Sequence, residues 1–576
     1  MTPHVARRSP IIAGLLTATM LAGLAPAQAQ AQAQAPRIYY VDHAGGDDGN
    51  DGLSPTKAWK HAPGDASFRN GTARMFTLNA GDTVRFRGGV RYRGSLMPRA
   101  AGTADAKVML DGSSWGAARA IFDGSDIAEG VRRCRSATEC FDNPHWQNLW
   151  RADIPVTAEW NTTLFVNDTP MQVAQWPAVQ AQDASNVNLF QAIPQAAYAQ
   201  LLAGSIAHSL PPGMATGTPV LALWNRPNEI GFTPDIRVTG SGLEFVGATW
   251  SSASFNPYPD RDNRFAIQNA PGQVNRPGLS AISPKDGVAI FWPTASLAAP
   301  RVALGTARTG INLARANHMV VRGFSFSNFN AHAIIQRSSN MGNVIRDNSF
   351  RSIAQTTAIW AVAARDFTIF RNDFQNLSWS AGIKIDSTLG PVMIRCNRMT
   401  DVTKTAINFN NVGNATVRAN TISGIKGNHA NGISAYNDSR NVLIDGNIVK
   451  NAARPFTTHG ARTMMHASGT PSVRVSNNIF LSSSDGGAGL TSYGRTPDFV
   501  VMNNFLSGPR FGMKLAGTET GFVATGNRLV GQVAITSKGA VSVTADANQL
   551  HSADGNGALL VQQMHKATIN PEACTS

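Results

Sequence analysis

Short apolar runs separated by polar turns fill the second half of the chain, without the spacing of an amphipathic helix. Between residues 306 and 534 these runs share a five-residue phrase with asparagine at its centre and an apolar residue at its end, as in FRNDF and RANTI. The repeated asparagines are Asn348, Asn372, Asn397, Asn420, Asn447, Asn478, Asn504 and Asn527. Their spacing of 23 to 31 residues predicts a solenoid in which each coil consists of short β-strands.

The repeated asparagine has a physical reason to occupy the same turn of every coil. Its amide can donate and accept hydrogen bonds along the solenoid axis, and so satisfy turn backbone that no sheet reaches. The pattern therefore predicts an asparagine ladder along the solenoid.

With these phrases the chain resembles the right-handed parallel β-helix superfamily, which includes pectate lyase, alginate lyases and chondroitinase B. The resemblance is strongest over residues 310–530. Two earlier segments resemble opening coils of such a helix, and three resemble the β-rich insertion of many polysaccharide-active members. These segments are 77–94 and 118–126 for the coils, and 149–154, 163–177 and 285–293 for the insertion. The resemblance implies an all-β fold, a right-handed parallel β-helix solenoid with a β-rich insertion in its N-terminal part.

The first residues are typical of a secretory signal peptide. Arg7 and Arg8 precede an apolar run over residues 11–24, and small residues follow. We expect a protein that is secreted or periplasmic. The expected parts are a signal peptide at 1–35, N-terminal coils at 36–130, the insertion at 131–305, the main repeats at 306–534 and a C-terminal cap at 535–576.

The four cysteines fit an oxidising compartment and carry no catalytic signal. Cys134 and Cys140 are close enough in sequence to close a small loop. Cys396 and Cys574 are expected to be unpaired or loosely paired.

The net charge of +14 is concentrated in the repeats. Residues 306–534 contain 23 Lys and Arg against 10 Asp and Glu. Because a secreted protein rarely meets nucleic acid, the expected partner is an anionic polysaccharide or oligosaccharide. No apolar stretch after the signal peptide is long enough to span a membrane, and we expect a monomer.

Alternation along the strand that follows each asparagine phrase divides its side chains between the core and the outside. The expected inward residues are Ile334, Ile359, Ile383, Ile407, Ile433, Leu490 and Met513. The expected outward residues are Ile335, Arg337, Trp360, Val362, Lys384, Asp386, Asn408, Asn410, Ser434, Tyr436, Thr491, Tyr493 and Lys514. Among them, a contiguous polar and aromatic stripe with Trp360 at one end consists of Lys384, Asp386, Asn408, Asn410, Tyr436 and Tyr493. Trp360 is placed to stack on a sugar ring, and His429 and Asn431 lie in the turn before the strand of Tyr436.

This stripe contains the groups that β-elimination on a uronate needs: a base, a group that neutralises the carboxylate, and an acid for the leaving oxygen. We expect Lys384 or His429 as the general base and Tyr436 as acid or second base, each with a pKa lowered toward neutrality. An ion pair with Asp386 is the alternative role for Lys384. His332, His459 and His466 are expected to be structural.

The remaining stripe residues are predicted to bind substrate. Asn408 and Asn410, with Arg337 or Lys514, could hold the carboxylate, and Asn431, Trp360 and Tyr493 could contact sugar. No cofactor is required, but Ca²⁺ held by Asp386 and the two asparagines would also neutralise a carboxylate. The acidic run at 45–54 lacks the terminal glutamate of an EF-hand and is predicted to be a solvated turn.

Glycoside hydrolysis needs two carboxylates, and the stripe supplies only Asp386. The favoured function is therefore a polysaccharide lyase that acts on a uronate-containing polymer. The alternatives are a glycoside hydrolase or transglycosidase that uses Asp386 and a second carboxylate, a non-catalytic polysaccharide-binding protein, and a C5-epimerase.

Overall fold

The computed structural model describes most of the chain from residue 35 onward. The described ranges are 35–65, 76–154, 158–179, 189–225, 229–245, 257–307, 309–354, 356–378, 381–427, 430–460, 472–484, 487–494, 496–515, 521–531, 533–536, 548–552 and 556–574. The chain from Pro36 onward forms one compact unit. The predicted signal peptide lies outside the described residues except for residue 35.

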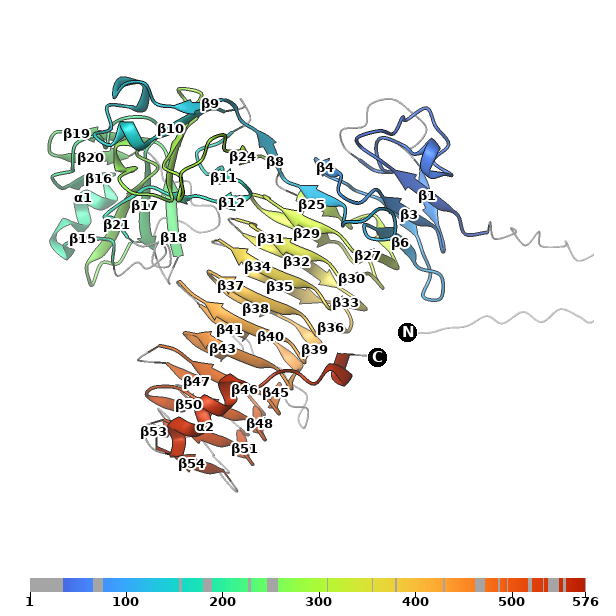
Figure 1. Cartoon of the computed structure of the whole chain (residues 1–576). Helices are drawn as coiled ribbons and strands as arrows, with labels where there is room; N and C mark the ends of the chain where they lie inside the picture. The colour runs from blue at the N-terminus through green and yellow to red at the C-terminus, as the bar shows by residue number, and fades with distance from the viewer. Residues whose placement is uncertain are drawn as a thin grey trace, which may run out of the picture. The chain divides into compact units, whose positions relative to one another are not determined.

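Three long sheets of mutually parallel strands form a β-helix, and from β27 to β52 each coil contributes one strand to each sheet (Figure 1). In the first coils, β2 (Thr77–Asn79), β5 (Arg99–Ala101) and β26 (Ala316–Asn317) form a separate small parallel sheet. Sheet I contains β1 (Ile38–Val41), β3 (Thr83–Phe86), β6 (Val108–Asp111), β27 (Met319–Arg322), β30 (Val344–Arg346), β33 (Phe367–Phe370), β36 (Val392–Arg395), β39 (Gly413–Arg418), β42 (Arg440–Asp445), β45 (Val473–Ser476), β48 (Val500–Met502) and β51 (Val523–Thr525).

Sheet II contains β4 (Arg91–Arg93), β7 (Ile121–Asp123), β28 (Ser325–Ser327), β31 (Ser349–Arg351), β34 (Asp373–Leu377), β37 (Arg398–Val402), β40 (Thr421–Ile425), β43 (Ile448–Ala452), β46 (Ile479–Ser482), β49 (Phe505–Ser507), β52 (Arg528–Val530) and β54 (Gln549–His551). Sheet III contains β25 (Thr309–Asn312), β29 (His332–Arg337), β32 (Thr357–Ala364), β35 (Ala381–Thr388), β38 (Thr405–Asn410), β41 (Asn431–Tyr436), β44 (Arg454–His459), β47 (Ala488–Ser492), β50 (Phe511–Leu515) and β53 (Val533–Thr536). The predicted parallel β-helix is confirmed.

One continuous apolar core fills the β-helix from the first coils to Leu529. Identical positions in successive coils carry the same kind of side chain, so that aromatic rings stack along the axis. The rings of Phe326, Phe350 and Phe374 are stacked with centroids 5.0 and 4.6 Å apart. Phe350 and Phe374 each follow a ladder asparagine by two residues, which explains the apolar end of the repeated phrase.

The predicted asparagine ladder is present. The side-chain oxygen of Asn372 accepts hydrogen bonds from both the backbone N–H and the amide of Asn348, at 3.0 and 3.1 Å. The same pair of bonds repeats through the later phrases and ends at Asn548. The eight ladder asparagines from Asn348 to Asn527 are at most 2% exposed, so they hold the turns of adjacent coils together where no strand does. Asn548, at the centre of the phrase DANQL, ends the ladder and was not among the predicted asparagines.

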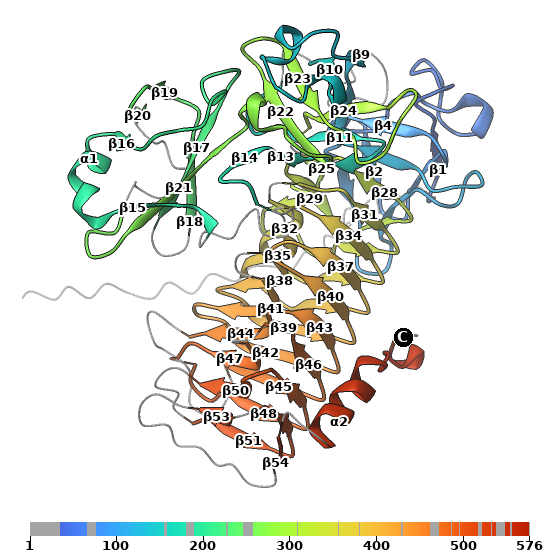
Figure 2. The ribbon, with the colours of Figure 1, turned by 60° about the vertical axis from the view of Figure 1, so that its left-hand side comes forward.

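The β-rich insertion replaces the turn between β7 of sheet II and β25 of sheet III (Figure 2). Its strands and short helix are β8 (Ser125–Ile127), β9 (Glu129–Arg133), β10 (Trp150–Asp153), β11 (Leu164–Val166), β12 (Thr169–Pro170), β13 (Gln172–Val173), β14 (Gln175–Trp176), β15 (Gln191–Ile193), α1 (Tyr198–Leu202), β16 (Ser205–Ala207), β17 (Val220–Asn225), β18 (Glu229–Thr233), β19 (Ile236–Thr239), β20 (Gly242–Phe245), β21 (Asn263–Gln268), β22 (Leu279–Ser283), β23 (Val288–Phe291) and β24 (Val302–Gly305). β8 pairs antiparallel with β24, so the first and last strands of the insertion lie side by side.

The insertion is fastened to the adjacent coils by polar contacts. Asp168 lies in the turn between β11 and β12 and forms salt bridges with Arg91 and Arg301. Asn330, two residues before β29, accepts a hydrogen bond from the hydroxyl of Thr163 at 2.9 Å. The insertion is therefore fixed beside the first strands of sheet III.

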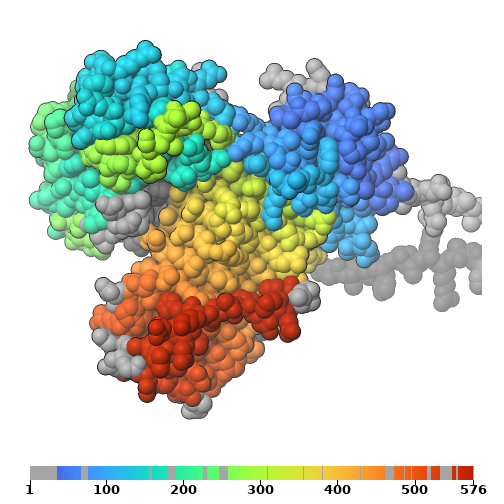
Figure 3. Space-filling view, viewed as in Figure 1, coloured from blue at the N-terminus to red at the C-terminus, as the bar shows by residue number. Residues whose placement is uncertain are grey.

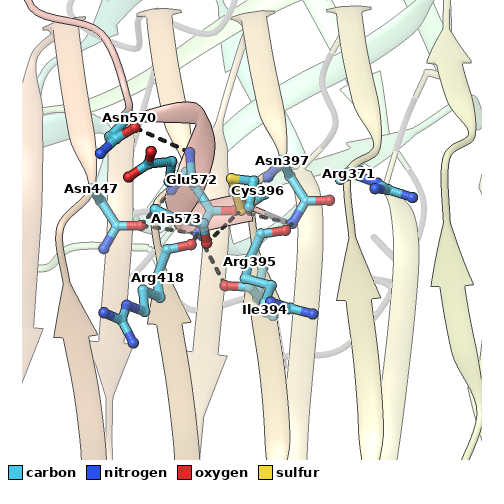
Figure 4. Close-up of a disulfide and its surroundings, with 12 residues drawn as sticks. Arg371, Ile394, Arg395, Cys396, Asn397, Arg418, Asn447, Asn570, Glu572 and Ala573 are labelled. Atoms are coloured by element: carbon cyan, nitrogen blue, oxygen red, sulfur yellow. Dashed lines mark hydrogen bonds between the residues drawn. A yellow bond between two sulfur atoms is a disulfide. The ribbon is translucent and has the colours of Figure 1, made fainter. Parts of the chain in front are cut away.

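After β54 the chain runs back along the outside of sheet II (Figure 3). Helix α2 (Asn556–His565) packs Leu560, Val561 and Met564 against an apolar patch of sheet II. Lys450 donates to the carbonyl of Ala567 at 2.7 Å. A disulfide then joins Cys574 to Cys396, 178 residues earlier (Figure 4). The expectation that these two cysteines are unpaired or loosely paired was wrong, whereas the disulfide between Cys134 and Cys140 is present.

Candidate functional site

The outer face of sheet III carries two rows of side chains in register from coil to coil. The first row contains Ile335, Trp360, Lys384, Asn408, Ser434, Thr457, Thr491 and Lys514. The second contains Arg337, Val362, Asp386, Asn410, Tyr436 and His459. The residues expected to point inward are at most 1% exposed. The register thus places the stripe on one face, as the alternation predicted.

Trp360 is the centre of the first group of contacts on this face, which we call the Trp360 cluster: His332, Arg337, Trp360, Lys384 and Asp386. The Arg337 guanidinium carbon and Lys384 Nζ lie 5.0 and 5.5 Å from its ring centroid. They come from the strands before and after it, so cations contact the ring from both neighbouring coils.

Asp386 accepts two hydrogen bonds within this cluster. Its Oδ2 atom lies 2.9 Å from Lys384 Nζ and 2.7 Å from the indole nitrogen of Trp360. The ion pair considered as the alternative role for Lys384 is therefore present. The Oδ1 atom of Asp386 is buried and has no hydrogen-bond partner among the described residues.

His332 joins the cluster with its ring centroid 5.0 Å from that of Trp360. Its Nδ1 lies 2.9 Å from the carbonyl oxygen of Thr357. A carbonyl only accepts, so Nδ1 carries the proton and the neutral ring has its lone pair on Nε2. Burial lowers the pKa of His332 below its usual value, the Thr357 hydrogen bond opposes this, and the Arg337 and Lys384 charges lower it further. The sequence predicts a structural role for His332; only its place at the start of a sheet III strand could have suggested otherwise.

A second group of contacts, the Tyr436 cluster, consists of Asn431, Tyr436 and Thr457. The Tyr436 hydroxyl lies 2.9 Å from the hydroxyl of Thr457 and accepts from the Asn431 amide at 3.2 Å. Burial raises the pKa of Tyr436, with a further contribution from Tyr493. The expectation of a lowered pKa for Tyr436 was therefore wrong, and its phenol is suited to donate a proton or hydrogen bond at neutral pH.

The two clusters are too far apart to act on one bond. Lys384 belongs to β35, and Thr457, the partner of the Tyr436 hydroxyl, belongs to β44, three coils further on. Coils stack about 4.8 Å apart, which places the strands roughly 14 Å from each other. The expected pairing of Lys384 as base with Tyr436 as acid is not assembled in the structure.

The remaining predicted residues are spread along the same face. Asn408 and Asn410 lie between the clusters, and Asn410 accepts from Asn437. Tyr493 follows β47 and is 39% exposed. Lys514 lies near the far end, with Nζ 5.8 Å from the Phe511 ring centroid. His429, Arg462 and His466 lie outside the described residues.

Side chains that commonly bind metal ions are spread over the described part of the chain. Among the described residues, no group of three or more His, Cys, Asp or Glu side chains is placed to hold a metal ion. Asp386 and its neighbour Asn410 stay the candidate oxygen ligands for Ca²⁺. The acidic run at 45–54 forms a capped turn, in which Asp47 and Asp51 each accept a backbone N–H, and Asp48 contacts His61.

The positive charge of the repeats is not confined to sheet III. Sheet I carries a row of arginines in register, Arg322, Arg346, Arg395 and Arg418. Part of that charge is compensated, because Asp111, Asp347 and Asp445 form salt bridges with members of this row. The cations that can attract an acidic ligand to sheet III are therefore those on sheet III itself, and the net charge of the repeats overstates them.

A pocket opens where sheet III turns into sheet I, next to the second row. It has a volume of about 380 Å³. Its lining residues are Thr388, Leu389, Gly390, Asn411, Gly413, Asn414, Asp438 and Arg440. These residues come from three successive coils.

Comparison with known proteins supports the fold. Residues 301–486 match the family described as periplasmic copper-binding protein (NosD), and residues 405–572 match the family described as right handed beta helix region. No curated protein matches the sequence. A solved structure described as a glycoside hydrolase aligns with 93% of this chain and 99% of its own, at 11% identity and a TM-score of 0.56.

Two further solved structures are similar over most of this chain. A complex of XylC with xylose covers 90% of this chain and 86% of its own, with 12% identity and a TM-score of 0.46. The GH136 lacto-N-biosidase from Eubacterium ramulus covers 90% and 68%, with 9% identity and a TM-score of 0.33. At these identities the likeness is one of fold. In the described part of the chain, no helix has the length and apolar character needed to cross a membrane.

Proposed function

We propose that this protein is a carbohydrate-active enzyme that acts outside the cytoplasm and cleaves a uronate-containing polysaccharide by β-elimination at the Trp360 cluster. The observation that carries the proposal is the geometry of the cluster, in which the His332 imidazole packs on Trp360 beside Arg337 and Lys384. Burial and the two cations also lower the pKa of His332. The two disulfides support a location in an oxidising compartment.

Each chemical need of β-elimination has a group in this cluster. Arg337 and Lys384 would neutralise the uronate carboxylate, which makes the C5 proton more acidic. Nε2 of His332 would remove that proton, and its electrons would form the C4=C5 double bond. The glycosidic oxygen on C4 would leave with a proton from the Lys384 ammonium, which Asp386 orients. His332 thus replaces Lys384 and His429 as the proposed base.

The Tyr436 cluster and the asparagines between the clusters would bind the neighbouring sugars of the chain. A polysaccharide parallel to the solenoid axis would pass both clusters, because they lie on one face in register. Asn408 and Asn410 would contact sugar hydroxyls, and exposed Tyr493 would offer an aromatic surface. A protonated Tyr436 would donate a hydrogen bond there and would not act as a base.

Hydrolysis is the second candidate function, because the carboxylate of Asp386 could act as one of the two carboxyl groups that a glycosidase needs. Asp386 has a buried Oδ1 without a partner among the described residues, which a substrate hydroxyl or water could satisfy. Asp438, in the pocket two coils further on and two residues beyond the register position of Asp386, would have to supply the second carboxylate, at a backbone separation of at least about 10 Å. Inverting glycosidases hold their carboxyl groups about 6.5–9.5 Å apart, so the two side chains would have to point toward each other.

The test is to incubate the purified full chain with alginate, pectate, hyaluronan and a uronate-bearing exopolysaccharide. The control substrates are the same polymers with their carboxyl groups reduced to alcohols. The proposal expects ultraviolet absorbance from the new C4=C5 double bond with an acidic polymer and none with its reduced form. New reducing ends without that absorbance would establish hydrolysis instead, and no product from any polymer would overturn both.

A further inference from the structure

The pocket between sheets III and I is built by stacked turns. Each of three successive coils leaves sheet III through a residue in the left-handed conformation: Ser387, Asn411 and Asn437, with φ of 57°, 55° and 57°. The residues just before them, Asp386, Asn410 and Tyr436, are in register. The three turns therefore repeat one geometry, and the segments that follow them line the pocket.

The lining combines hydrogen-bonding groups with one apolar side chain. Asn411 and Asn414 offer amides, and Asp438 and Arg440 bring opposite charges. Leu389 is 61% exposed at the rim. Polar groups that can both donate and accept, next to an apolar contact, suit a sugar with its hydroxyls and C–H face. One side chain of each charge in the same lining disfavours a ligand with a net charge of either sign.

We propose that this pocket binds a neutral sugar unit of the substrate, either a side branch or a neutral residue next to the uronate. This deepens the proposed function, on which its link to the polysaccharide rests. The pocket begins two residues beyond Asp386 at Thr388, so a branch on a chain that lies along sheet III would reach it. A branched acidic heteropolysaccharide would then be preferred to an unbranched uronan.

Gly413 provides a way to fill the pocket without breaking the turn. A Cβ on Gly413 would point between Thr388 and Arg440, at 3.7 Å from Thr388 Oγ1 and 4.0 Å from Arg440 Cγ, which are ordinary contact distances. The hydrogen bonds between Gly413 and the Thr388 hydroxyl use the Gly413 backbone and would remain. Gly413→Leu therefore adds bulk to the pocket alone.

Gly240 in the insertion supplies the matched control. A Cβ on Gly240 would have no described atom within 4 Å, and this glycine lies outside the pocket, so Gly240→Leu makes the same chemical change elsewhere. Equal thermal unfolding temperatures for both variants and the native chain would establish that the fold is intact. The binding probes are glucose, galactose, mannose and N-acetylglucosamine as neutral sugars, and glucuronate as the charged one.

Saturation-transfer difference NMR with the full chain measures each sugar. The proposal expects a signal from at least one neutral sugar that falls at least fivefold in Gly413→Leu and is unchanged in Gly240→Leu. The glucuronate signal should instead depend on Lys384→Ala. A neutral-sugar signal that survives Gly413→Leu, no neutral-sugar signal at all, or a glucuronate signal that depends on Gly413 would overturn it.

The two proposals can fail separately. If the native chain cleaves no polymer but the Gly413-dependent signal is present, the pocket stands and the lyase does not. If cleavage of unbranched polymers occurs without any such signal, the lyase stands and the pocket does not.

Discussion

The indole N–H of Trp360 donates to Oδ2 of Asp386 in the next coil at 2.7 Å, on the same oxygen that Lys384 contacts. This arrangement makes one carboxylate the support of both an aromatic ring and a cation. Asp386 can therefore act by positioning its neighbours in a lyase, or directly in a hydrolase. The relative effects of two substitutions distinguish these roles.

If Asp386 only positions its neighbours, Asp386→Asn should lower kcat by about ten- to a hundredfold, because the amide still accepts from Trp360 but no longer pairs with Lys384. Lys384→Ala should lower it further, by about 10²–10⁴-fold, because it removes the proton donor. Steady-state kinetics on the same substrate compare the two. The reverse order, with Asp386→Asn the more damaging, would favour direct catalysis by Asp386.

The activity of the native enzyme should fall in acid because of His332. Its pKa is lowered by burial, so the basic form is populated at pH values above that lowered pKa and is lost as the pH falls through it. The acid limb of kcat/KM should lie below about pH 6.5. His332→Gln should lower kcat/KM by about 10²–10⁴-fold and remove that limb. His459→Gln, an exposed histidine on the same face, is the control; an unchanged limb in His332→Gln would exclude His332 as the base.

Tyr436→Phe should destabilise the fold by about 1–3 kcal/mol, because it leaves the buried Asn431 amide and Thr457 hydroxyl without a partner. Urea denaturation measures this, and exposed Tyr493→Phe should change stability by less than about 0.5 kcal/mol.

The contribution of Tyr436 to the free energy of unfolding should fall as the pH rises. The pKa of Tyr436 is raised on folding, so its contribution is complete below the unfolded pKa near 10 and is lost as the pH rises through the folded value. Native stability should therefore decline above about pH 10, and more steeply than that of Tyr436→Phe. Equal slopes would mean that the phenol titrates normally.

The parts of this structure that repeat were predictable from sequence, and the parts that depend on single contacts were not. Asn372 and Ile383 recur in kind at every coil, so eight copies of the pattern define the ladder and the inward face. The Tyr436 hydroxyl contacts Asn431 of its own strand and Thr457 of the next coil, and no repeated pattern encodes these contacts. Burial raises the pKa of Tyr436, and its hydroxyl lies beside Thr457, on the side away from Lys384.

Cysteine pairing was predictable only where the chain is short. Cys134 and Cys140 are only six residues apart, so a short loop keeps them close together, whereas Cys396 and Cys574 are 178 residues apart. Their pairing requires the C-terminal segment to run back along sheet II, which depends on α2 packing and on Lys450. No periodic pattern encodes that path.

The long-range disulfide should contribute more to stability than the local one. Loop-closure entropy alone predicts about 5 kcal/mol for the 178-residue loop and about 2 kcal/mol for the six-residue loop. Replacing Cys396 and Cys574 together by alanine should therefore lower the free energy of unfolding in urea by about 2–5 kcal/mol, and more than the same change at Cys134 and Cys140. The first variant should also become sensitive to limited proteolysis near α2, because the end of the tail is no longer held. Equal losses in the two variants, with α2 still protected, would show that the apolar contacts of α2 and the Lys450 hydrogen bonds fasten the tail without the disulfide.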